Sequence, residues 1–449
     1  MYSKILFTLL LYHFITLSLF SQEIKNLPAG QAGGEVYSYA RKIVDTMASE
    51  SMHGRGYVNG GDSLAANYLK NEFSKIGLKS FGSDYYQRLS FAINTFPYES
   101  PSLFLGRVKE DCLVGANFIV TAGSPSIHTK ENHLAIWFDS STVYSLDLMK
   151  KFTKTKFNKK WIIIDSHGVT DKDKLKLFDF MKTNPYDACG LAIVNSKLTW
   201  TCSQKVNKYP SVEFVITDSE RSKINKKEKC FITFSAKTKF LPNHQSQNVI
   251  GYIQGSVHPD SFIVYSAHYD HLGQMGKDVY FPGANDNASG CAMLLNLANY
   301  YSQPENKPKY SIAFMAFCGE EVGLLGSKYY TEHPLFPMKN IRFLLNMDIM
   351  GTGEEGITVV NGSVFKTEFD KLKEINTQHN FIKDVKIRGK AANSDHYFFA
   401  ENGVKACFIY TMGGIKAYHD IYDRAETLPL NEFENLFKLI TKFGDYLQN

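Results

Sequence analysis

The sequence predicts an α/β sandwich, a sheet covered by helices on both sides, with a second, β-rich segment inserted into it. Two observations predict the sandwich. From residue 248 onward, apolar runs alternate with helical patterns, and these runs are nearly continuous, as expected for strands buried on both faces. A third observation predicts the insert. Between about residues 100 and 241, short β-rich runs follow one another, separated by lysine-rich loops.

The composition is that of a globular protein of two or three domains. The chain has 449 residues, 44% hydrophobic and 21% charged, and a domain typically takes about 100–200 residues. These fractions exclude a disordered chain and a coiled coil. Fifty basic and 45 acidic residues leave a net charge of +5. That excess is too small and too evenly spread to indicate a nucleic-acid partner.

Residues 1–21 have the pattern of an export signal. Lys4 is the basic residue, an apolar run covers residues 5–20, and the small Ser21 precedes the expected cleavage point. A membrane-spanning helix is the alternative, but the run is shorter than the roughly 20 residues that spanning requires, and it contains His13. We therefore expect a cleaved signal peptide, a secreted or periplasmic protein and no stable membrane anchor.

The elements follow in order from the spacing of apolar residues. Residues 34–78 carry two helical stripes, the second closed by Gly77, around a glycine-rich loop. In the middle stretch we expect one helix, at Asp171–Met181, and strands at Phe118–Thr121, Leu134–Phe138, Trp161–Asp165, Gly190–Asn195 and Val212–Thr217. The alternating strands and helices of the last part are Asn248–Ile253, Ser261–Ala267, Ala288–Tyr301, Tyr310–Phe317, Gly323–Tyr330 and Ile341–Met347.

The seven cysteines form neither a recognisable disulfide framework nor a CxxC metal pair. Cys189 and Cys202 are the one candidate bridge. The loops of the middle stretch show no cluster of His, Asp and Glu, so we assign no chemistry to it.

Side chains that can bind a metal follow directly after the apolar runs, and ligands of α/β sheets lie beyond the carboxyl ends of the strands. His268 and Asp270 end the first such run, and their spacing of two points both the same way, so Asp270 can orient the imidazole. Asp286 lies in a turn between glycines just before a helix. Taken alone, a solvated loop histidine and a helix N-cap are the alternatives for His268 and Asp286.

Three further runs end in the same way. Glu320 and Glu321 are adjacent carboxylates that repel each other unless a cation or a proton lies between them. Asp348 is embedded among hydrophobic residues and therefore needs a partner. The last run is followed by Tyr418 and His419.

In this order, the motifs resemble those of the co-catalytic di-zinc aminopeptidases, whose relatives include glutamate carboxypeptidase II and the glutaminyl cyclases. The match covers about residues 34–91 and 247–448. It also includes Gly54-Arg-Gly56, the lead-in Asn248–Gly255 and the Ser394-Asp-His396 motif, in which the resemblance implies a structural role for His396. The resemblance implies a mixed, mainly parallel sheet sandwiched by helices, as in the zinc aminopeptidases.

The resemblance also implies roles for the site residues. Asp286 would bridge two zinc ions, and a cis peptide is expected between Asp286 and Asn287. His268 and Asp348 would complete one zinc site, and Glu321 and His419 the other. Glu320 would be the general base and Asp270 the group that orients His268. Tyr418 would stabilise the oxyanion, with a packing aromatic as the alternative.

The middle stretch resembles a degenerate protease-associated insert. We therefore expect residues 22–95 and 243–449 to form a discontinuous zinc peptidase domain, with residues 96–242 inserted as a β-rich protease-associated-like domain. The function implied is a secreted exopeptidase that hydrolyses N-terminal residues from peptides. A carboxypeptidase, an N-acyl-amino-acid hydrolase and a glutaminyl cyclase are the alternatives. A binding protein without catalysis is disfavoured, because every ligand and the base are present.

Overall fold

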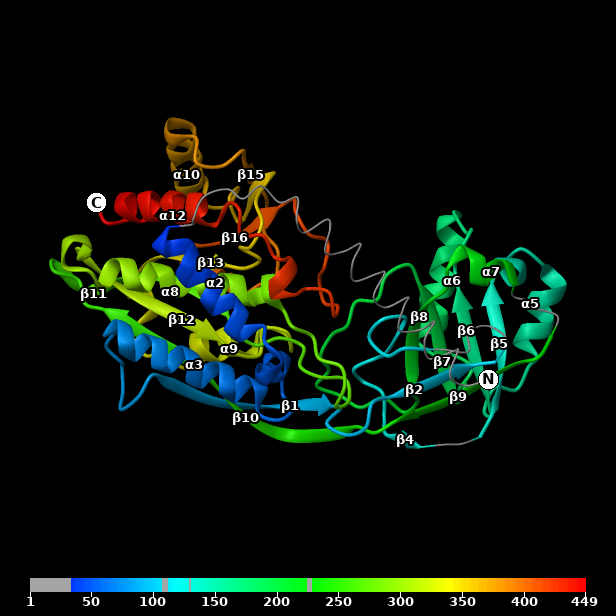
Figure 1. Ribbon diagram of the computed structural model, residues 1–449. Coiled ribbons are helices and arrows are strands. Elements are labelled where there is room, and N and C mark those ends of the chain that lie inside the picture. The colour runs from blue at the N-terminus through cyan, green and yellow to red at the C-terminus, as the bar shows by residue number, and fades with distance from the viewer. Residues whose placement is uncertain (1–33, 107–111, 129–130, 224–227) are drawn as a thin grey trace, which may run out of the picture.

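The computed structural model describes residues 34–106, 112–128, 131–223 and 228–449. Two units, each a sheet with helices against it, lie next to each other and are joined by long strands (Figure 1). The expected signal peptide lies outside the described residues. Among the described residues, no helix has the length and apolar character needed to cross a membrane.

The larger sheet contains most of the second half of the chain. Its strands are β1 (Tyr86–Thr95), β10 (Lys239–Ile253), β11 (His258–His268), β12 (Tyr310–Phe317), β13 (Ile341–Met347), β14 (Gly356–Val360), β15 (Val385–Ile387) and β16 (Ala406–Met412). They lie in the order β1-β10-β12-β11-β13-β16-β14-β15. The central strands β12, β11, β13 and β16 are parallel neighbours, and β14 pairs in parallel with β15. The mixed, mainly parallel sheet that was predicted is confirmed.

Helices cover both faces of this sheet. On one face lie α2 (Glu35–Met47), α3 (Gly61–Ile76), α8 (Ser289–Ser302), α10 (Lys366–His379) and α12 (Phe433–Leu447), and on the other α9 (Leu325–Glu332) and α11 (His396–Glu401). Strand residues alternate between the two cores. Tyr265 and Phe314 face the first set of helices, whereas Val264 and Met315 face the second. The central strands are therefore buried on both faces, as predicted.

One strand is longer than its apolar run. The pattern predicted a strand from Asn248, yet β10 begins at Lys239. Its first half carries mostly exposed polar side chains but pairs with β1, so that Lys239 lies opposite Thr95. Backbone pairing outside the core leaves no hydrophobic pattern, which is why the sequence did not show it.

The smaller sheet is built from the middle of the chain. Its strands are β2 (Ser102–Leu105), β3 (Phe118–Val120), β4 (Ile127–His128), β5 (His133–Asp139), β6 (Lys160–Asp165), β7 (Gly190–Asn195), β8 (Ser211–Val215) and β9 (Cys230–Ala236). The order is β2-β9-β5-β6-β7-β8-β3, with β4 paired to β9, and β5 to β8 run parallel. Each of the five strands predicted here corresponds to an observed one.

This unit contains more helix than the sequence predicted. The one expected helix is α6 (Lys172–Lys182), capped by the Asp171 side chain. Three others are present among the described residues, at α4 (Ser140–Val143), α5 (Leu146–Thr153) and α7 (Asp218–Lys223). None of them exceeds 8 residues, too short a stretch for an apolar period of 3.6 to repeat clearly.

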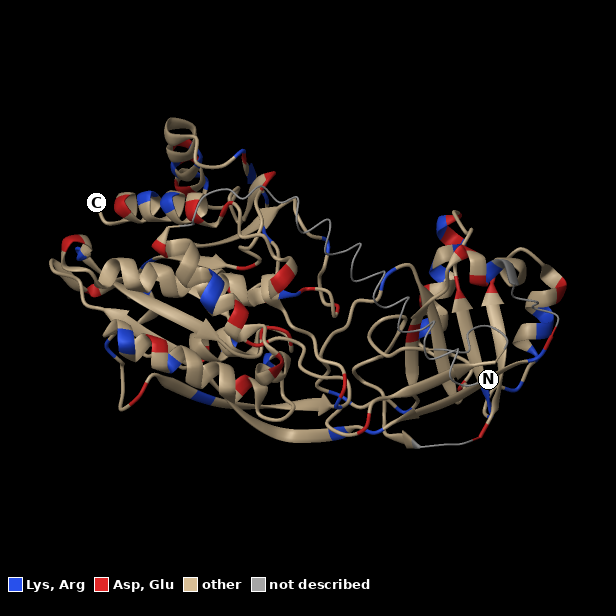
Figure 2. Cartoon of the chain, in the orientation of Figure 1, with Lys and Arg blue, Asp and Glu red and all other residues tan. Residues whose placement is uncertain are grey.

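The expectation of a disulfide between Cys189 and Cys202 is wrong, because neither cysteine is bridged. The Cys189 sulfur lies 3.9 Å from Nδ1 of His133 within the smaller unit. The Cys202 side chain instead packs against the cores of both units. Figure 2 shows basic and acidic residues scattered over both units, in keeping with the small net charge.

Candidate metal centre

The predicted site residues meet at one edge of the larger sheet. His268 is the last residue of β11, Glu320 and Glu321 follow β12, and Asp348 follows β13. His419 lies in the segment after β16. Because these four strands are parallel neighbours, their carboxyl ends lie together, and the loops that leave them meet.

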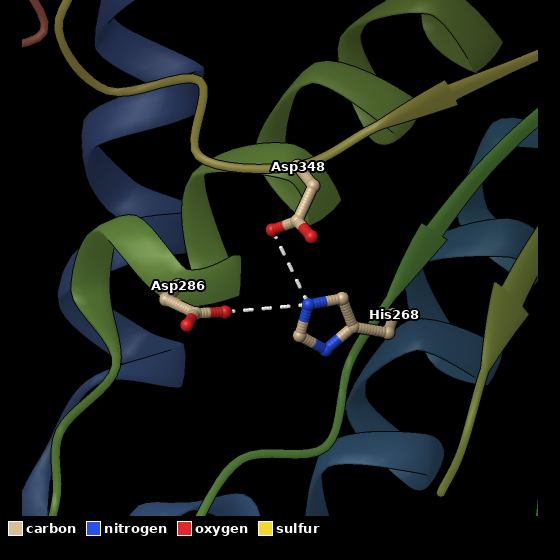
Figure 3. A group of neighbouring side chains, drawn as sticks. All are labelled: His268, Asp286 and Asp348. Carbon is tan, nitrogen blue, oxygen red and sulfur yellow. Dashed lines mark hydrogen bonds and ion pairs between the residues drawn. The ribbon is translucent and has the colours of Figure 1, made fainter. Parts of the chain in front are cut away.

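A first group of donors forms around His268. Its Nε2 lies 3.3 Å from Oδ1 of Asp286 and 3.3 Å from Oδ1 of Asp348 (Figure 3). All three side chains are buried. Ser394 donates a hydrogen bond of 3.2 Å to the other oxygen of Asp348, which fixes that carboxylate. The ligand atoms of the three residues lie within 4.8 Å of one another, close enough to hold one metal ion.

A second group forms on the other side of Asp286. Nε2 of His419 lies 3.1 Å from Oδ2 of Asp286 and 3.2 Å from Oε2 of Glu321. The Asp286 carboxylate therefore faces His268 with one oxygen and His419 with the other. This central position was predicted, and it is the geometry that a carboxylate shared by two ions requires.

The loop that carries Asp286 is held from two directions. The peptide bond between Asp286 and Asn287 is cis, as predicted. Asp423 accepts hydrogen bonds from the backbone nitrogens of Asn285, at 2.8 Å, and of Asp286, at 3.0 Å. The fully buried Arg55 donates to the carbonyls of Gly283, at 2.7 Å, and of Asp286, at 3.2 Å. These bonds hold the carboxylate in the centre of the site.

Asp270 holds His268 differently from the prediction. The carboxylate was expected to accept the bond from Nδ1 of His268, but Nδ1–H donates to the backbone carbonyl of Asp270, at 3.1 Å. The nearer carboxylate oxygen is 3.8 Å away. That carboxylate accepts instead from the Tyr57 hydroxyl, at 2.7 Å, and from the backbone nitrogens of Glu320 and Glu321. Asp270 thus supports both donor groups. Its backbone carbonyl fixes the His268 ring, and its carboxylate fixes the loop after β12, which carries Glu321.

Glu320 faces an open pocket of about 330 Å³ that is lined by both donor groups. Asp286, Glu321, Asp348 and His419 lie on its walls. Burial raises the pKa of Glu320 well above its usual value, and nearby carboxylates raise it further. The pocket gives this carboxylate access to any molecule bound beside the donors.

His271 also belongs to the centre, and the sequence reading missed it. The imidazole is fully buried, and its Nδ1–H donates to Oε1 of Glu321 over 2.7 Å. The signal was a second histidine three residues after His268. The ligand atoms of His271, Asp286 and Glu321 also lie within 4.8 Å of one another. Because Nδ1 carries the proton in its bond to Glu321, we assign His271 the role of orienting this carboxylate, whose opposite oxygen faces His419.

We expect His271→Ala and His419→Ala to differ in metal stoichiometry. Loss of His419 removes a donor, so one of two ions should be lost. Loss of His271 removes only the group that orients Glu321, so both ions should remain, with affinity reduced by about 10–100-fold. Zinc content after dialysis and competition with a chromogenic chelator measure both quantities. If the His271 variant lost one ion while the His419 variant kept two, His271 would be the metal donor and His419 the orienting group.

The smaller unit reaches the centre through Trp200. Nδ1–H of His419 donates to the Trp200 carbonyl over 2.9 Å, and the Trp200 backbone nitrogen donates back to the His419 carbonyl over 2.9 Å. Among its described residues, the middle of the chain supplies no donor to either group, but Trp200 fixes one of the imidazoles.

Tyr418 stacks on the His419 ring, with centroids 4.0 Å apart. It is 44% exposed and lines both the pocket of Glu320 and a second pocket of about 240 Å³. The side chain therefore packs against the site and faces open space at the same time.

The donor set fits divalent cations. Asp286, Glu320, Glu321 and Asp348 line one pocket, and among the described residues no lysine or arginine forms an ion pair with any of them. Burial by itself lowers the pKa of His419, but the Glu321 and Asp286 carboxylates outweigh this effect and raise the pKa to about 11. Without cations, protons on the imidazoles would have to balance this charge. Two imidazoles with three carboxylates are the donors that zinc prefers.

The buried His396, predicted to be structural, begins α11 and packs against the Phe408 ring, with centroids 5.4 Å apart. Burial lowers the pKa of His396 to about 4, against about 6.5 in an unfolded chain. As the pH falls, the unfolded state therefore binds a proton first, and stability is lost. Of the stability present at pH 7.5, about 2–3 kcal/mol should be lost by pH 4.5 through this residue.

A His396→Asn variant checks this expectation in metal-free protein. Its loss of stability between pH 7.5 and pH 4.5, measured by urea unfolding, should be smaller than that of the unmodified chain by the same 2–3 kcal/mol. Equal losses in the two proteins would mean that His396 does not titrate on unfolding.

Part of the chain is similar in sequence to known peptidases. Residues 248–444 match the model of peptidase family M28. Aminopeptidase YwaD of Bacillus subtilis is 40% identical over 124 residues, which are 26% of this chain and 25% of that protein. A probable zinc metalloprotease of Pyricularia oryzae is 37% identical over 113 residues, 24% of this chain and 22% of that protein. The chain thus spans about a quarter of the length of these curated relatives.

Two solved structures share the fold over nearly the whole chain. A peptidase M28 precursor from Shewanella amazonensis superposes with a TM-score of 0.68 at 15% identity, covering 92% of this chain and 93% of that one. BSAP, a zinc aminopeptidase from Bacillus subtilis, gives 0.64 at 19% identity, covering 92% and 96%. At these identities the likeness concerns the fold.

Proposed function

We propose that this protein is a zinc-dependent aminopeptidase that removes N-terminal residues from peptides, because residues 248–444 match the model of peptidase family M28. The observation that carries the proposal is the Asp286 carboxylate, which lies between His268 and His419 with one oxygen directed at each. The names of the matched relatives, an aminopeptidase and a zinc metalloprotease, support it. The sequence pattern of residues 1–21 supports export from the cytoplasm.

In this proposal the two donor groups would hold two ions. His268, Asp286 and Asp348 would hold one, and Asp286, Glu321 and His419 would hold the other. When bound, zinc lowers the pKa of water and polarises the scissile carbonyl.

Glu320 is the proposed general base. Its carboxylate is in the pocket between the two donor groups, where it can take a proton from the attacking water. Burial raises its pKa, so the proton can stay on Glu320 until it passes to the leaving amine. Asp270 supports this step by accepting a bond of 3.2 Å from the Glu320 backbone nitrogen.

Tyr418 is the proposed donor to the oxyanion. Its ring is fixed by stacking on His419, and the residue lines both pockets beside Asp286. A preorganised hydroxyl of this kind stabilises charge that develops on the carbonyl oxygen. A Tyr418→Phe variant that keeps full turnover would leave the residue with packing alone.

The proposal is tested with aminoacyl anilides that have free or blocked amines, before and after removal of zinc. We expect hydrolysis of the free-amine compounds only, its loss on chelation and its recovery with added zinc. Preference for blocked amines would indicate an N-acyl-amino-acid hydrolase. Release of C-terminal residues from peptides would indicate a carboxypeptidase, and cyclisation of an N-terminal glutamine a glutaminyl cyclase.

A further inference from the structure

We propose that Arg388 forms a subsite for a substrate carboxylate beside the metal centre, an inference that rests on the proposed peptidase function. Arg388 directly follows β15 and lines the same 330 Å³ pocket as Glu320 and His419. Of the described residues that line this pocket, it is the only lysine or arginine.

Within the described part of the chain, the Arg388 guanidinium has no acidic partner. Among the ion pairs between described residues, none involves Arg388, and its Nη1 donates only to the Tyr410 hydroxyl, at 3.3 Å. Lys390, two residues further along, differs because it pairs with Glu401. Arg388 therefore keeps hydrogen-bond donors for a ligand, and a guanidinium binds a carboxylate through two parallel bonds.

The charge of the pocket supports an anionic ligand. Two divalent ions would balance the four carboxylates on its walls, so that Arg388 leaves an excess of one positive charge. The volume is at the lower end of the roughly 300–1,000 Å³ typical of ligand pockets. The carboxylate should therefore lie within one or two residues of the scissile bond. It is either the C-terminus of a very short peptide or an acidic side chain.

Two substrate pairs distinguish these sources. The first is a dipeptide and its C-terminal amide, and the second is an anilide of glutamate and that of glutamine. In the pair that matches the true source, the carboxylate compound should have a kcat/KM about five- to tenfold higher than that of its amide. Arg388→Gln should bring this ratio of the two kcat/KM values to about one. Lys390→Gln removes a neighbouring charge outside the pocket and should leave the ratio as it was.

The subsite would be overturned if the ratio were near one for both pairs in the unmodified protein. It would also be overturned if Arg388→Gln left a raised ratio unchanged. Such a result is distinct from failure of the proposed function, in which neither the amide nor the glutamine anilide would be hydrolysed.

A second, independent observation concerns the contact between the two units. We infer that the loop around Trp200 is a positioning element for His419, so that the middle segment helps to build the site. The loop is anchored at three points besides the two bonds to His419. The Trp200 indole nitrogen donates to the Val120 carbonyl over 2.8 Å, and its ring stacks on Phe281 at 4.6 Å. Lys197 pairs with the Asp420 carboxylate over 3.2 Å.

Lys197 also spans the segment that carries His419. Its ammonium donates to the carbonyls of Lys416, at 2.9 Å, and Tyr418, at 3.3 Å. The backbone of residues 416–420 is thus fixed by the smaller unit on both sides of the imidazole. Since Nδ1–H of His419 is held by the Trp200 carbonyl, Nε2 points at Asp286 and Glu321.

The test measures metal binding in protein prepared without metal. Lys197→Met and Trp200→Leu should each weaken the binding of one of two ions by about 10–100-fold and leave the other near its original affinity. Cobalt(II) titrated into the same proteins should show a changed visible absorption for one ion only. Lys205→Met, in the same loop, makes the same change at an exposed side chain and is the control.

Thermal unfolding of the metal-free variants shows whether each is folded. Lys197→Met is the decisive variant, because its side chain is 47% exposed and no core depends on it. Two ions bound by folded Lys197→Met with unchanged affinity and unchanged cobalt absorption would overturn the inference.

Discussion

Replacement of Glu320 by glutamine is expected to lower kcat by about 10²–10⁴-fold, the range that general base catalysis contributes. The glutamine keeps the shape of the side chain in the pocket but cannot take a proton from water. Glu320 belongs to neither of the two donor groups around Asp286, so both metals should stay bound. Turnover of a free aminoacyl anilide and zinc content by atomic absorption are the two measurements.

The same two measurements on Glu321→Gln, the variant of the neighbouring glutamate, serve as the control. Glu321→Gln should lose one ion, since Glu321 faces His419 at 3.2 Å and accepts the bond from His271. If Glu320→Gln lost an ion with its activity while Glu321→Gln kept both, the roles of the two carboxylates would be exchanged.

Substitution of Asp286 by alanine should have the largest effect of any single change. Both donor groups include this carboxylate, so each ion loses a ligand at once. We expect neither zinc to survive dialysis, and activity to fall to that of metal-free protein. A metal centre supplies several kcal/mol of transition-state stabilisation, which corresponds to about a thousandfold or more in rate.

Asp348→Ala is the matched comparison, because Asp348 belongs to one group only. It should cost one ion and leave the other. A protein with alanine at position 286 that retained one tightly bound zinc would show that Asp286 serves a single ion and does not bridge.

The sequence predicted the strands β10 to β13 of the larger sheet because they contain continuous apolar runs, whereas β1, β14 and β15 were not predicted. The bounds of β12 and β13 agree with the predicted ones to the residue. The convergence of Glu321 and Asp348 followed from the same pattern, because each comes soon after a strand and parallel strands end at one edge.

Other features leave no local pattern. Arg55 is a single charged residue between glycines, and nothing near it in the sequence shows that its guanidinium is buried against the Asp286 loop, 231 positions away. The Trp200 carbonyl meets His419 across 219 positions through a backbone oxygen, a group that every residue carries. The spacing of two residues correctly predicted that Asp270 lies next to the His268 ring. It could not show whether the carboxylate or the backbone carbonyl of Asp270 accepts the hydrogen bond from that ring.

The pairing of Thr95 with Lys239 has a consequence for how the chain folds. The two residues lie opposite each other where β1 meets β10, so residues 96–238 leave the larger unit and return to it at one place. If this segment were a flexible loop, bringing β1 to β10 would cost roughly 4 kcal/mol in closure entropy, against about 2 kcal/mol for a loop of ten residues. Once the smaller sheet has formed, β2 and β9 already pair antiparallel, and they deliver the ends of β1 and β10 side by side. Early formation of the smaller unit would then speed assembly of the larger sheet. Substitutions that destabilise the smaller unit would therefore appear first as slow refolding of the chain.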